Sequence, residues 1–262
     1  MNQFTLSILR DVYDGSPLSQ QSDILLSESG HKYNFDGNIP VLLNTNFLSG
    51  DNAKYKNMYN WMYRLYDFAE KYVGRIYYGN TIKKLRTELM AKLEISDGDK
   101  ILYVSIGTGT DLTFLQDTID LNSNTIVGAD ISIGMLKKCA KNLRKWKIKA
   151  DLVNCCAESL PFASESFDVV FHVGGINFFS DRRRAVNEML RVAKPGTKLL
   201  IADETQKLVE ELYRKNPASK RYFDDAAVWS ASPASMLPDG VEDIENDIHM
   251  SNRFYSITFR KK

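Results

Sequence analysis

Two glycines and an aspartate near the middle of the chain have the residue types and the spacing of a ligand-binding site. The apolar run ILYV (101–104) leads into SIGTGTD (105–111), where Gly107 and Gly109 let the backbone approach a ligand that a Cβ atom would block. Asp130 ends the next apolar run, and a carboxylate there can accept hydrogen bonds from both hydroxyls of a ribose. The pattern predicts a nucleotide-type ligand but does not separate a dinucleotide from an adenosyl group.

Three further features favour the adenosyl group. A dinucleotide loop needs a small third residue where this chain has Leu112. The segment CAESLPFASESFDVVF (156–171) follows the third expected strand, at the place where an adenine edge would lie. The chain also closes with two antiparallel segments, VEDIENDIHM (241–250) and RFYSITFR (253–260), instead of a sixth parallel strand.

Strands and helices must alternate to position these residues. Continuous apolar strands separated by amphipathic helices predict a parallel sheet that is covered on both faces, with ligands bound beyond the carboxyl ends of the strands. Asp111, Ser132 and Asp181 precede helical patterns and are expected to cap them. The predicted fold is α/β, a doubly wound, seven-stranded, mostly parallel sheet with a C-terminal antiparallel hairpin. The five parallel strands are expected at 100–106, 125–130, 150–157, 167–173 and 197–203.

Composition sets the class of protein. The 262 residues carry a formal net charge of +1, with 44% hydrophobic and 26% charged residues, which is typical of a globular protein with a full core. This charge balance disfavours nucleic acid as the main partner. No stretch predicts a membrane span or a signal peptide, and three cysteines without metal-ligand spacing favour a cytoplasmic protein without a metal site.

Residues 55–262 resemble the class I S-adenosylmethionine-dependent methyltransferases, and most of all the small-molecule group of the ubiquinone/menaquinone C-methyltransferases. The resemblance rests on four stretches in the right order and spacing. It implies a Rossmann-like methyltransferase fold, S-adenosyl-L-methionine as cofactor and methyl transfer to a small, partly apolar molecule. The stretches are ILYVSIGTGTDL, VGADIS, CCAESLPFASESFDVV and EMLRVAKPGTKLLIADE.

The resemblance also implies roles for individual residues. Gly107, Thr108 and Gly109 would line the methionine part of the cofactor, and Asp130 would hold the ribose. His172 would lie where methionine and acceptor meet and is a candidate base, while Tyr66, in a Tyr-Asp pair, would touch the methionine end. Ile131 and Met135 would lie beside the adenine, with Cys156, Ala157 and Glu158 along its edge.

The sequence departs from the family at three of these positions. The acidic residue usual near the end of the first strand is Tyr103, the first glycine is Ser105, and an aspartate before Ala157 is Cys156. Losing a carboxylate weakens the hold on the cofactor's ammonium group, because neutral acceptors bind a cation less well than a charge does. The Tyr103 and Ser105 hydroxyls are expected to recover part of that contact, and backbone carbonyls or Glu158 to serve the adenine amine.

The N-terminal part divides into two regions. Residues 1–50 look strand-poor, with one hairpin expected around Asp36-Gly37, and 51–98 form a helical lid ahead of an α/β core at 99–262. The segment SGHKYNFDGNIPVLL is similar to the end of a zinc ribbon that precedes some methyltransferase domains. It lacks the cysteines of such a ribbon, and His31 alone cannot build a tetrahedral site.

Three functions stay open. The first is methyl transfer to a small molecule, with His172 and Tyr59 as candidate catalytic residues; Tyr59 belongs to a tyrosine stripe (55–66) that either packs a helix or lines the acceptor pocket. The second is an RNA methyltransferase, suggested only by the N-terminal likeness. The third is a non-catalytic cofactor-binding protein, suggested by Tyr103 and Ser105. The oligomeric state does not follow from the sequence.

Overall fold

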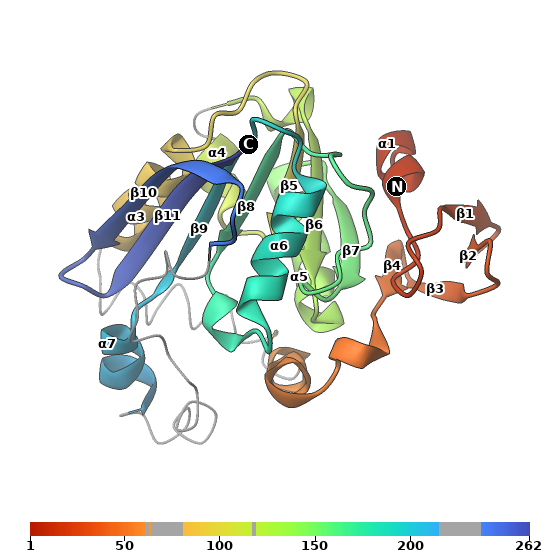
Figure 1. Ribbon diagram of the computed structural model, residues 1–262, viewed down its shortest axis with the longest axis horizontal. Helices are drawn as coiled ribbons and strands as arrows, with labels where there is room; N and C mark the ends of the chain where they lie inside the picture. Colours follow the sequence, from red (N-terminus) through yellow and green to blue (C-terminus); the bar gives the residue numbers. More distant parts are fainter. Residues whose placement is uncertain (61–62, 64–80, 117–118, 215–236) are drawn as a thin grey trace.

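One mixed sheet organises the chain. The computed structural model describes residues 1–60, 63, 81–116, 119–214 and 237–262. Eleven strands of these residues line up in the order β1-β2-β3-β4-β7-β6-β5-β8-β9-β11-β10 (Figure 1). Among the described helices, none combines the length and apolarity needed to cross a membrane.

Five parallel strands form the centre of the sheet, as the apolar runs predict. The first of them, β5, pairs with β6 on one side and with β8 on the other, so the strand order reverses at β5. Ligands bind at such a reversal in open α/β sheets. The parallel strands are β5 (Lys100–Val104), β6 (Thr125–Asp130), β7 (Asp151–Cys155), β8 (Val169–Val173) and β9 (Lys198–Glu204).

The expected C-terminal hairpin completes the seven-stranded part of the sheet. Strand β11 (Phe254–Lys261) runs antiparallel to β9, and β10 (Val241–His249) pairs with β11 at the edge. The register places Phe254 opposite Glu204, so the start of β11 reaches the same edge of the sheet at which β9 ends.

Alternate side chains of each central strand enter two different cores. Leu102 and Val104 join the core under α1 and α6, whereas Ile101 and Tyr103 join the core under α3, α4 and α5. Both faces are thus buried, which explains why apolar residues predominate along the whole length of each strand. The covering helices are α1 (Gln3–Ile8), α3 (Thr81–Ala91), α4 (Leu112–Gln116), α5 (Ile133–Trp146) and α6 (Arg182–Val192).

Shorter helical turns occupy the connections. Residues 50–60 are helical and lead toward the cavity described below. The others are η1 (Thr45–Phe47), η2 (Leu121–Ser123), η3 (Ile176–Phe178), α7 (Gln206–Leu208) and η4 (Val209–Arg214).

Two of the three expected helix caps are confirmed. The Ser132 hydroxyl accepts a hydrogen bond from the Met135 amide at 3.2 Å, and the Asp181 carboxylate accepts one from the Arg184 amide at 2.9 Å. The expectation for Asp111 was wrong in its chemistry. Only the Asp111 carbonyl joins α4, because its carboxylate is taken by side chains of the core.

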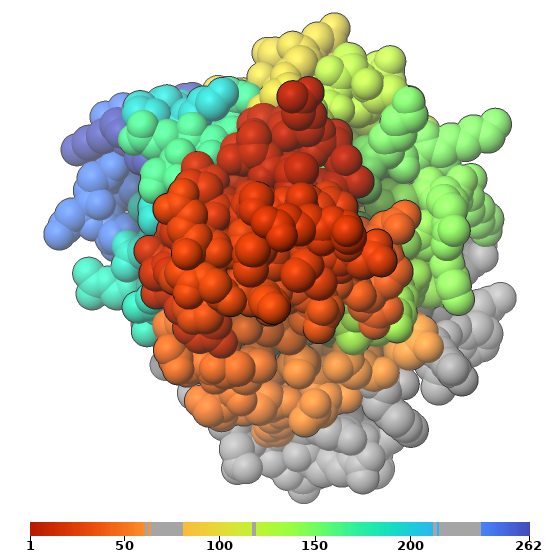
Figure 2. Space-filling model, turned by 90° about the vertical axis from the view of Figure 1, so that its right-hand side faces the viewer, coloured from red at the N-terminus to blue at the C-terminus, as the bar shows by residue number. Residues whose placement is uncertain are grey.

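Residues 1–50 contain more strand than their sequence predicts. They form β1 (Leu18–Gln21), β2 (Ile24–Ser27), β3 (Lys32–Asp36) and β4 (Ile39–Leu42). The hairpin at Asp36-Gly37 is confirmed, and β4 then runs parallel to β7, with Leu42 opposite Cys155. Figure 2 shows this N-terminal segment (red to orange) as a continuous layer over its end of the molecule.

A polar cluster stabilises the N-terminal segment. His31 Nδ1 lies 2.8 Å from Asp11 Oδ2, and one ligand atom each of Asp11, Asp14 and His31 fall within 4.8 Å of one another. Asp11 and Asp14 therefore lie beside His31 in the folded segment, although they are distant from it in the sequence.

Candidate active site

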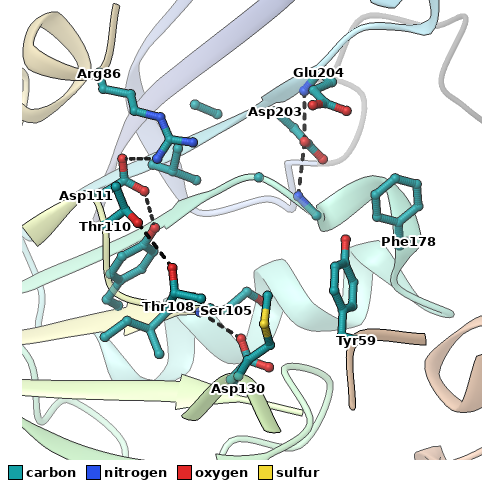
Figure 3. A pocket seen from close by; sticks show the side chains of 18 of the residues that line it. Tyr59, Arg86, Ser105, Thr108, Thr110, Asp111, Asp130, Phe178, Asp203 and Glu204 are labelled. Carbon is teal, nitrogen blue, oxygen red and sulfur yellow. Dashed lines mark hydrogen bonds and ion pairs between the residues drawn. The ribbon is translucent and has the colours of Figure 1, made fainter. Parts of the chain in front are cut away.

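A cavity of about 180 Å³ lies beyond the carboxyl ends of β5, β6, β8 and β9, where the strand order reverses. Residues 105–108 and 110–111 line one wall of it, and residues 173–175 and 202–204 line another. The helix at 50–60 contributes Tyr55 and Tyr59, and α3 contributes Arg86 (Figure 3). Most of the residues singled out from the sequence therefore meet at one place.

The loop after β5 contains residues with left-handed backbone angles and one glycine that packs closely against α5. Ser105 and Gly107 both have left-handed backbone angles, with φ of +59° and +55°, and both line the cavity. Gly109 also has positive φ (+81°), but a Cβ there would lie 2.9 Å from Cys139 Sγ on α5. Gly109 therefore serves packing between the loop and α5, and it does not line the cavity.

Asp130 links this loop to the end of β6. Its carboxylate accepts hydrogen bonds from the Gly107 amide at 2.9 Å and from the Ser132 amide at 2.8 Å. Burial raises the pKa of Asp130 to about 6, and these two hydrogen bonds lower it only in part. A carboxylate held in this way at a cavity wall can accept hydrogen bonds from ligand hydroxyls while it is ionised.

The start of α5 forms the wall next to Asp130. Ile131 and Met135 line the cavity, as the sequence predicts. The Ser132 hydroxyl donates to Asn60 Oδ1 at 2.7 Å, which ties this turn to the helix at 50–60. The same helix brings the Tyr55 ring to 4.5 Å from the ring of Phe178, measured between centroids.

The segment expected at the adenine edge borders a second, smaller cavity of about 20 Å³. Ala157 and Glu158 line it together with Asp130 and Ile131. The Glu158 carboxylate already accepts a hydrogen bond from the Asn52 side chain at 2.9 Å. Cys156 lines neither cavity; it is fully buried, and burial raises the pKa of its thiol to about 12.

His172 lies behind the cavity wall. It is fully buried, its Nδ1 lies 3.1 Å from the Val104 carbonyl, and its ring packs edge-on against Phe179. Burial lowers the pKa of His172 to about 4, so the ring is neutral near pH 7. The residues that line the cavity do not include His172, so its position does not favour direct proton transfer to or from a ligand.

The far wall carries the two acidic residues at the end of β9. Asp203 accepts hydrogen bonds from the Gly175 amide at 3.0 Å and the Asn177 amide at 2.9 Å, which fixes the loop after β8. Burial raises the pKa of Asp203. Glu204 and Tyr255 line the same side of the cavity.

Arg86 was not predicted from the sequence as a residue of the site, and Asp111 was predicted there only as a helix cap. Arg86, on α3, lies 2.6 Å from a carboxylate oxygen of Asp111, and the Tyr103 hydroxyl donates to the other oxygen at 2.5 Å. All three residues line the cavity. The sequence feature that could have indicated Arg86 is its position beside Leu85 and Leu89, because a charged residue next to the apolar face of an amphipathic helix points toward the core. Tyr66 and its neighbour Asp67 lie outside the described residues.

Comparison with known proteins identifies the family of the chain. A family model described as "Methyltransferase domain" matches residues 102–201. Demethylmenaquinone methyltransferase of Paenarthrobacter aurescens is 32% identical over 187 residues, which cover 66% of this chain and 70% of the relative. The ubiquinone/menaquinone biosynthesis C-methyltransferase UbiE of Cronobacter sakazakii is 35% identical over 44% of this chain and 46% of its own.

A solved structure supports the fold. The crystal structure of a SAM-dependent methyltransferase from Aquifex aeolicus superimposes with a TM-score of 0.54 at 17% identity, over 68% of this chain and 89% of the other. The identity and coverage of the Paenarthrobacter relative, together with this fold, establish the family. The chain belongs to the class I S-adenosylmethionine-dependent methyltransferases, among the relatives of the ubiquinone/menaquinone C-methyltransferases.

Proposed function

We propose that this chain binds S-adenosyl-L-methionine in the cavity at the strand reversal and transfers its methyl group to a small, partly apolar molecule. The observation that carries the proposal is the Asp130 carboxylate, fixed by the Gly107 and Ser132 amides at the cavity wall. A ribose with two free hydroxyls fits such an acceptor. Family membership and the names of the relatives support the cofactor, since both describe methyltransferases.

The residues present fit the cofactor at several points. Gly107 leaves the loop backbone close to the cavity without a side chain, and the Ser105 and Thr108 hydroxyls add polar groups beside it. Ile131 and Met135 offer an apolar surface next to Asp130. Ala157 and Glu158 border the smaller cavity on the other side of Asp130, where we place the adenine edge.

The acceptor side is mostly apolar and aromatic. Tyr59 and Phe178 lie on the side of the cavity opposite Thr110 and Asp111 (Figure 3). The Tyr55 ring packs against Phe178, and Phe254 is a further ring among the residues that line the cavity. Such a surface suits a flat or partly apolar molecule, and the quinone-related names of the relatives are compatible with it. We place Tyr59 against the acceptor, while His172 keeps the end of β8 in position from behind the wall.

The bound cofactor would supply an electrophilic methyl group on a sulfonium centre. The chain's own contribution is then to hold the acceptor in line and to exclude water, and such positioning can supply up to roughly 7–11 kcal/mol of barrier reduction. Asp203 stabilises the loop that carries Gly175 and Phe178, and so fixes part of the acceptor wall.

The test combines binding and turnover. Calorimetry with S-adenosylmethionine and S-adenosylhomocysteine should show binding that Asp130→Ala weakens by about 10- to 100-fold, the value of one or two charged hydrogen bonds. Asp23→Ala, an exposed aspartate on the N-terminal segment, is the matched control. With methyl-labelled cofactor and a cell extract, label should enter molecules of low mass. Label found only in RNA or protein, or no binding by the unmodified protein, would refute the proposal.

A further inference from the structure

The outer side of α5 and the turn after it carry a cluster of positive charges. Between residues 131 and 150 the chain has seven lysine and arginine residues and no aspartate or glutamate. The whole chain has a formal net charge of +1, so the rest of it, with 27 basic and 33 acidic residues, carries a net charge of −6. The positive charge is therefore concentrated on one part of a molecule that is otherwise acidic.

The packing of α5 directs these charges away from the core. The helix lies on β6 and β7, and the core beneath it contains Leu136, Cys139 and Leu143. At 3.6 residues per turn, positions 137, 141, 144 and 145 fall on the opposite side of the helix. Five exposed residues of this side and of the turn that follows form what we call the basic face: Lys141, Arg144, Lys145, Lys147 and Lys149.

Within the described part of the chain, the basic face has no acidic partner. Asp36 reaches α5 from the N-terminal segment, but it pairs with Lys137, one turn before the basic face, at 2.8 Å. Asp151 follows the basic face in the sequence, and its carboxylate accepts a hydrogen bond from the Asn2 amide at 2.9 Å. The charges of the basic face are therefore available to an anion outside the molecule.

Helix stability explains only part of this cluster. The C-terminal end of a helix favours cations, and Arg144 and Lys145 lie in the last turn of α5. Because that effect falls off within one turn, it does not explain Lys141 or Lys149. Lys137, Lys141 and Lys145 also follow one another at four-residue spacing, where like charges repel. An external anionic partner would offset that repulsion.

The basic face suits a flat anionic surface better than a polynucleotide. A nucleic acid that contacts several sides of the protein would meet the net negative charge of the rest of the chain, whereas a bilayer contacts one side only. Single-stranded nucleic acids also stack their bases on aromatic rings. The one aromatic residue between 131 and 150 is Trp146, and its ring packs against the core. Clusters of roughly four to eight basic residues are typical of segments that bind anionic lipids.

We propose that the basic face binds the anionic surface of a lipid bilayer. The apolar side of α5 stays in the core, so binding is electrostatic and the helix does not insert. Met135, in the first turn of α5, lines the cavity, and Lys141 follows less than two turns later. The docked protein therefore holds this wall of the cavity near the bilayer, where a partly apolar acceptor is concentrated. Only this last step rests on the proposed function.

Co-sedimentation of the full chain with vesicles tests the docking directly. One set of vesicles is phosphatidylcholine alone, and in the other about a third of the lipid is phosphatidylglycerol, which supplies the negative charge. The protein should bind only the second set. An increase from about 0.05 M to about 0.5 M salt should release it, because salt screens exposed charges.

A triple variant with Lys141→Gln, Lys145→Gln and Lys149→Gln tests the basic face itself. Each basic residue near an anionic surface raises the affinity about fivefold, so the triple variant should bind roughly 100-fold more weakly. Its melting temperature should be unchanged or higher, since repulsion between like charges is removed. The matched control loses the same charge at exposed positions on other elements and should bind within about twofold of the unmodified protein. Its substitutions are Arg183→Gln, Lys207→Gln and Lys262→Gln.

Three results would overturn the proposal: no binding to either set of vesicles, equal binding to both, or an equal loss in the triple variant and the matched control. A short single-stranded RNA is the competing probe. If the basic face binds this RNA more tightly than the phosphatidylglycerol vesicles at about 0.15 M salt, the partner is a polynucleotide and the proposal fails. None of these measurements uses S-adenosylmethionine, so their failure is distinct from a failure of the proposed function.

Discussion

Protonation of Asp130 should weaken cofactor binding as the pH falls through about 6. Burial raises the pKa of this carboxyl to about 6, well above the ordinary value of 3.8, so it loses its charge within an accessible pH range. In the proposed complex the ribose hydroxyls would donate to the ionised form, and the bound state is therefore expected to titrate at lower pH than the free protein. Affinity should be highest when Asp130 is ionised, at neutral pH and above.

The size of the effect follows from the ionised fraction. With a pKa of about 6, close to all of Asp130 is ionised at about pH 7.5, and roughly one molecule in ten at about pH 5. When only the ionised form binds well, the apparent Kd is the intrinsic Kd divided by that fraction. The apparent Kd should therefore rise about tenfold over this range.

Methylthioadenosine is the appropriate probe, because it keeps the ribose but has no amino or carboxyl group that titrates. Calorimetry across the range should show a bend near pH 6 for the unmodified protein. Asp130→Asn cannot ionise and should give a flat profile with weaker binding throughout. A constant Kd for the unmodified protein, or the same bend in Asp130→Asn, would show that another group controls binding.

Three further changes test the local structure. Ser132→Ala removes the cap of α5 and should lower the free energy of unfolding in urea by about 1–2 kcal/mol; an unchanged midpoint would contradict the cap. Gly109→Ala should destabilise more than Gly107→Ala, by about 1–3 kcal/mol, because only the former meets Cys139 at 2.9 Å, and equal melting temperatures would refute this. Tyr255→Phe deletes a buried hydroxyl that has no hydrogen-bond partner among the described residues, so thermal unfolding should occur at the same or a higher temperature, whereas a marked drop would reveal a partner.

The pattern of apolar runs was sufficient to predict the central sheet. Each parallel strand is buried on both faces, so its sequence is mostly apolar and the position of the strand can be predicted from it. The caps at Ser132 and Asp181 were equally accessible, since each bonds to an amide only three residues away. The parallel strands and the two caps depend on residues that are close together in the chain, so a short segment of sequence is sufficient to predict them.

Features that depend on distant partners were not predictable in the same way. Asp111 has the spacing of a cap, but Tyr103 and Arg86 compete for its carboxylate, and α3 brings Arg86 there through tertiary packing. His172 ends an expected strand, and the sequence does not predict that its ring lies against the Val104 carbonyl and does not line the cavity.

The N-terminal strands were missed for a related reason. Strand β1 has three exposed residues out of four, so its sequence carries little apolar signal. Strand β4 owes its place to the edge of β7, which lies more than a hundred residues further along the chain. A short segment of sequence does not show that a strand will pair with the edge of another strand far along the chain.

The pairing of β4 with β7 has a consequence for work with shortened versions of this protein. A fragment cut to the methyltransferase core would leave the backbone amides and carbonyls along β7 without their neighbour and would uncover side chains such as Phe167, now in contact with Phe4. An exposed edge strand of this kind pairs with strands of other molecules, so we expect the shortened protein to precipitate or to form mixed aggregates. The first fifty residues cover the edge of β7 and should be kept together with the core when the protein is shortened.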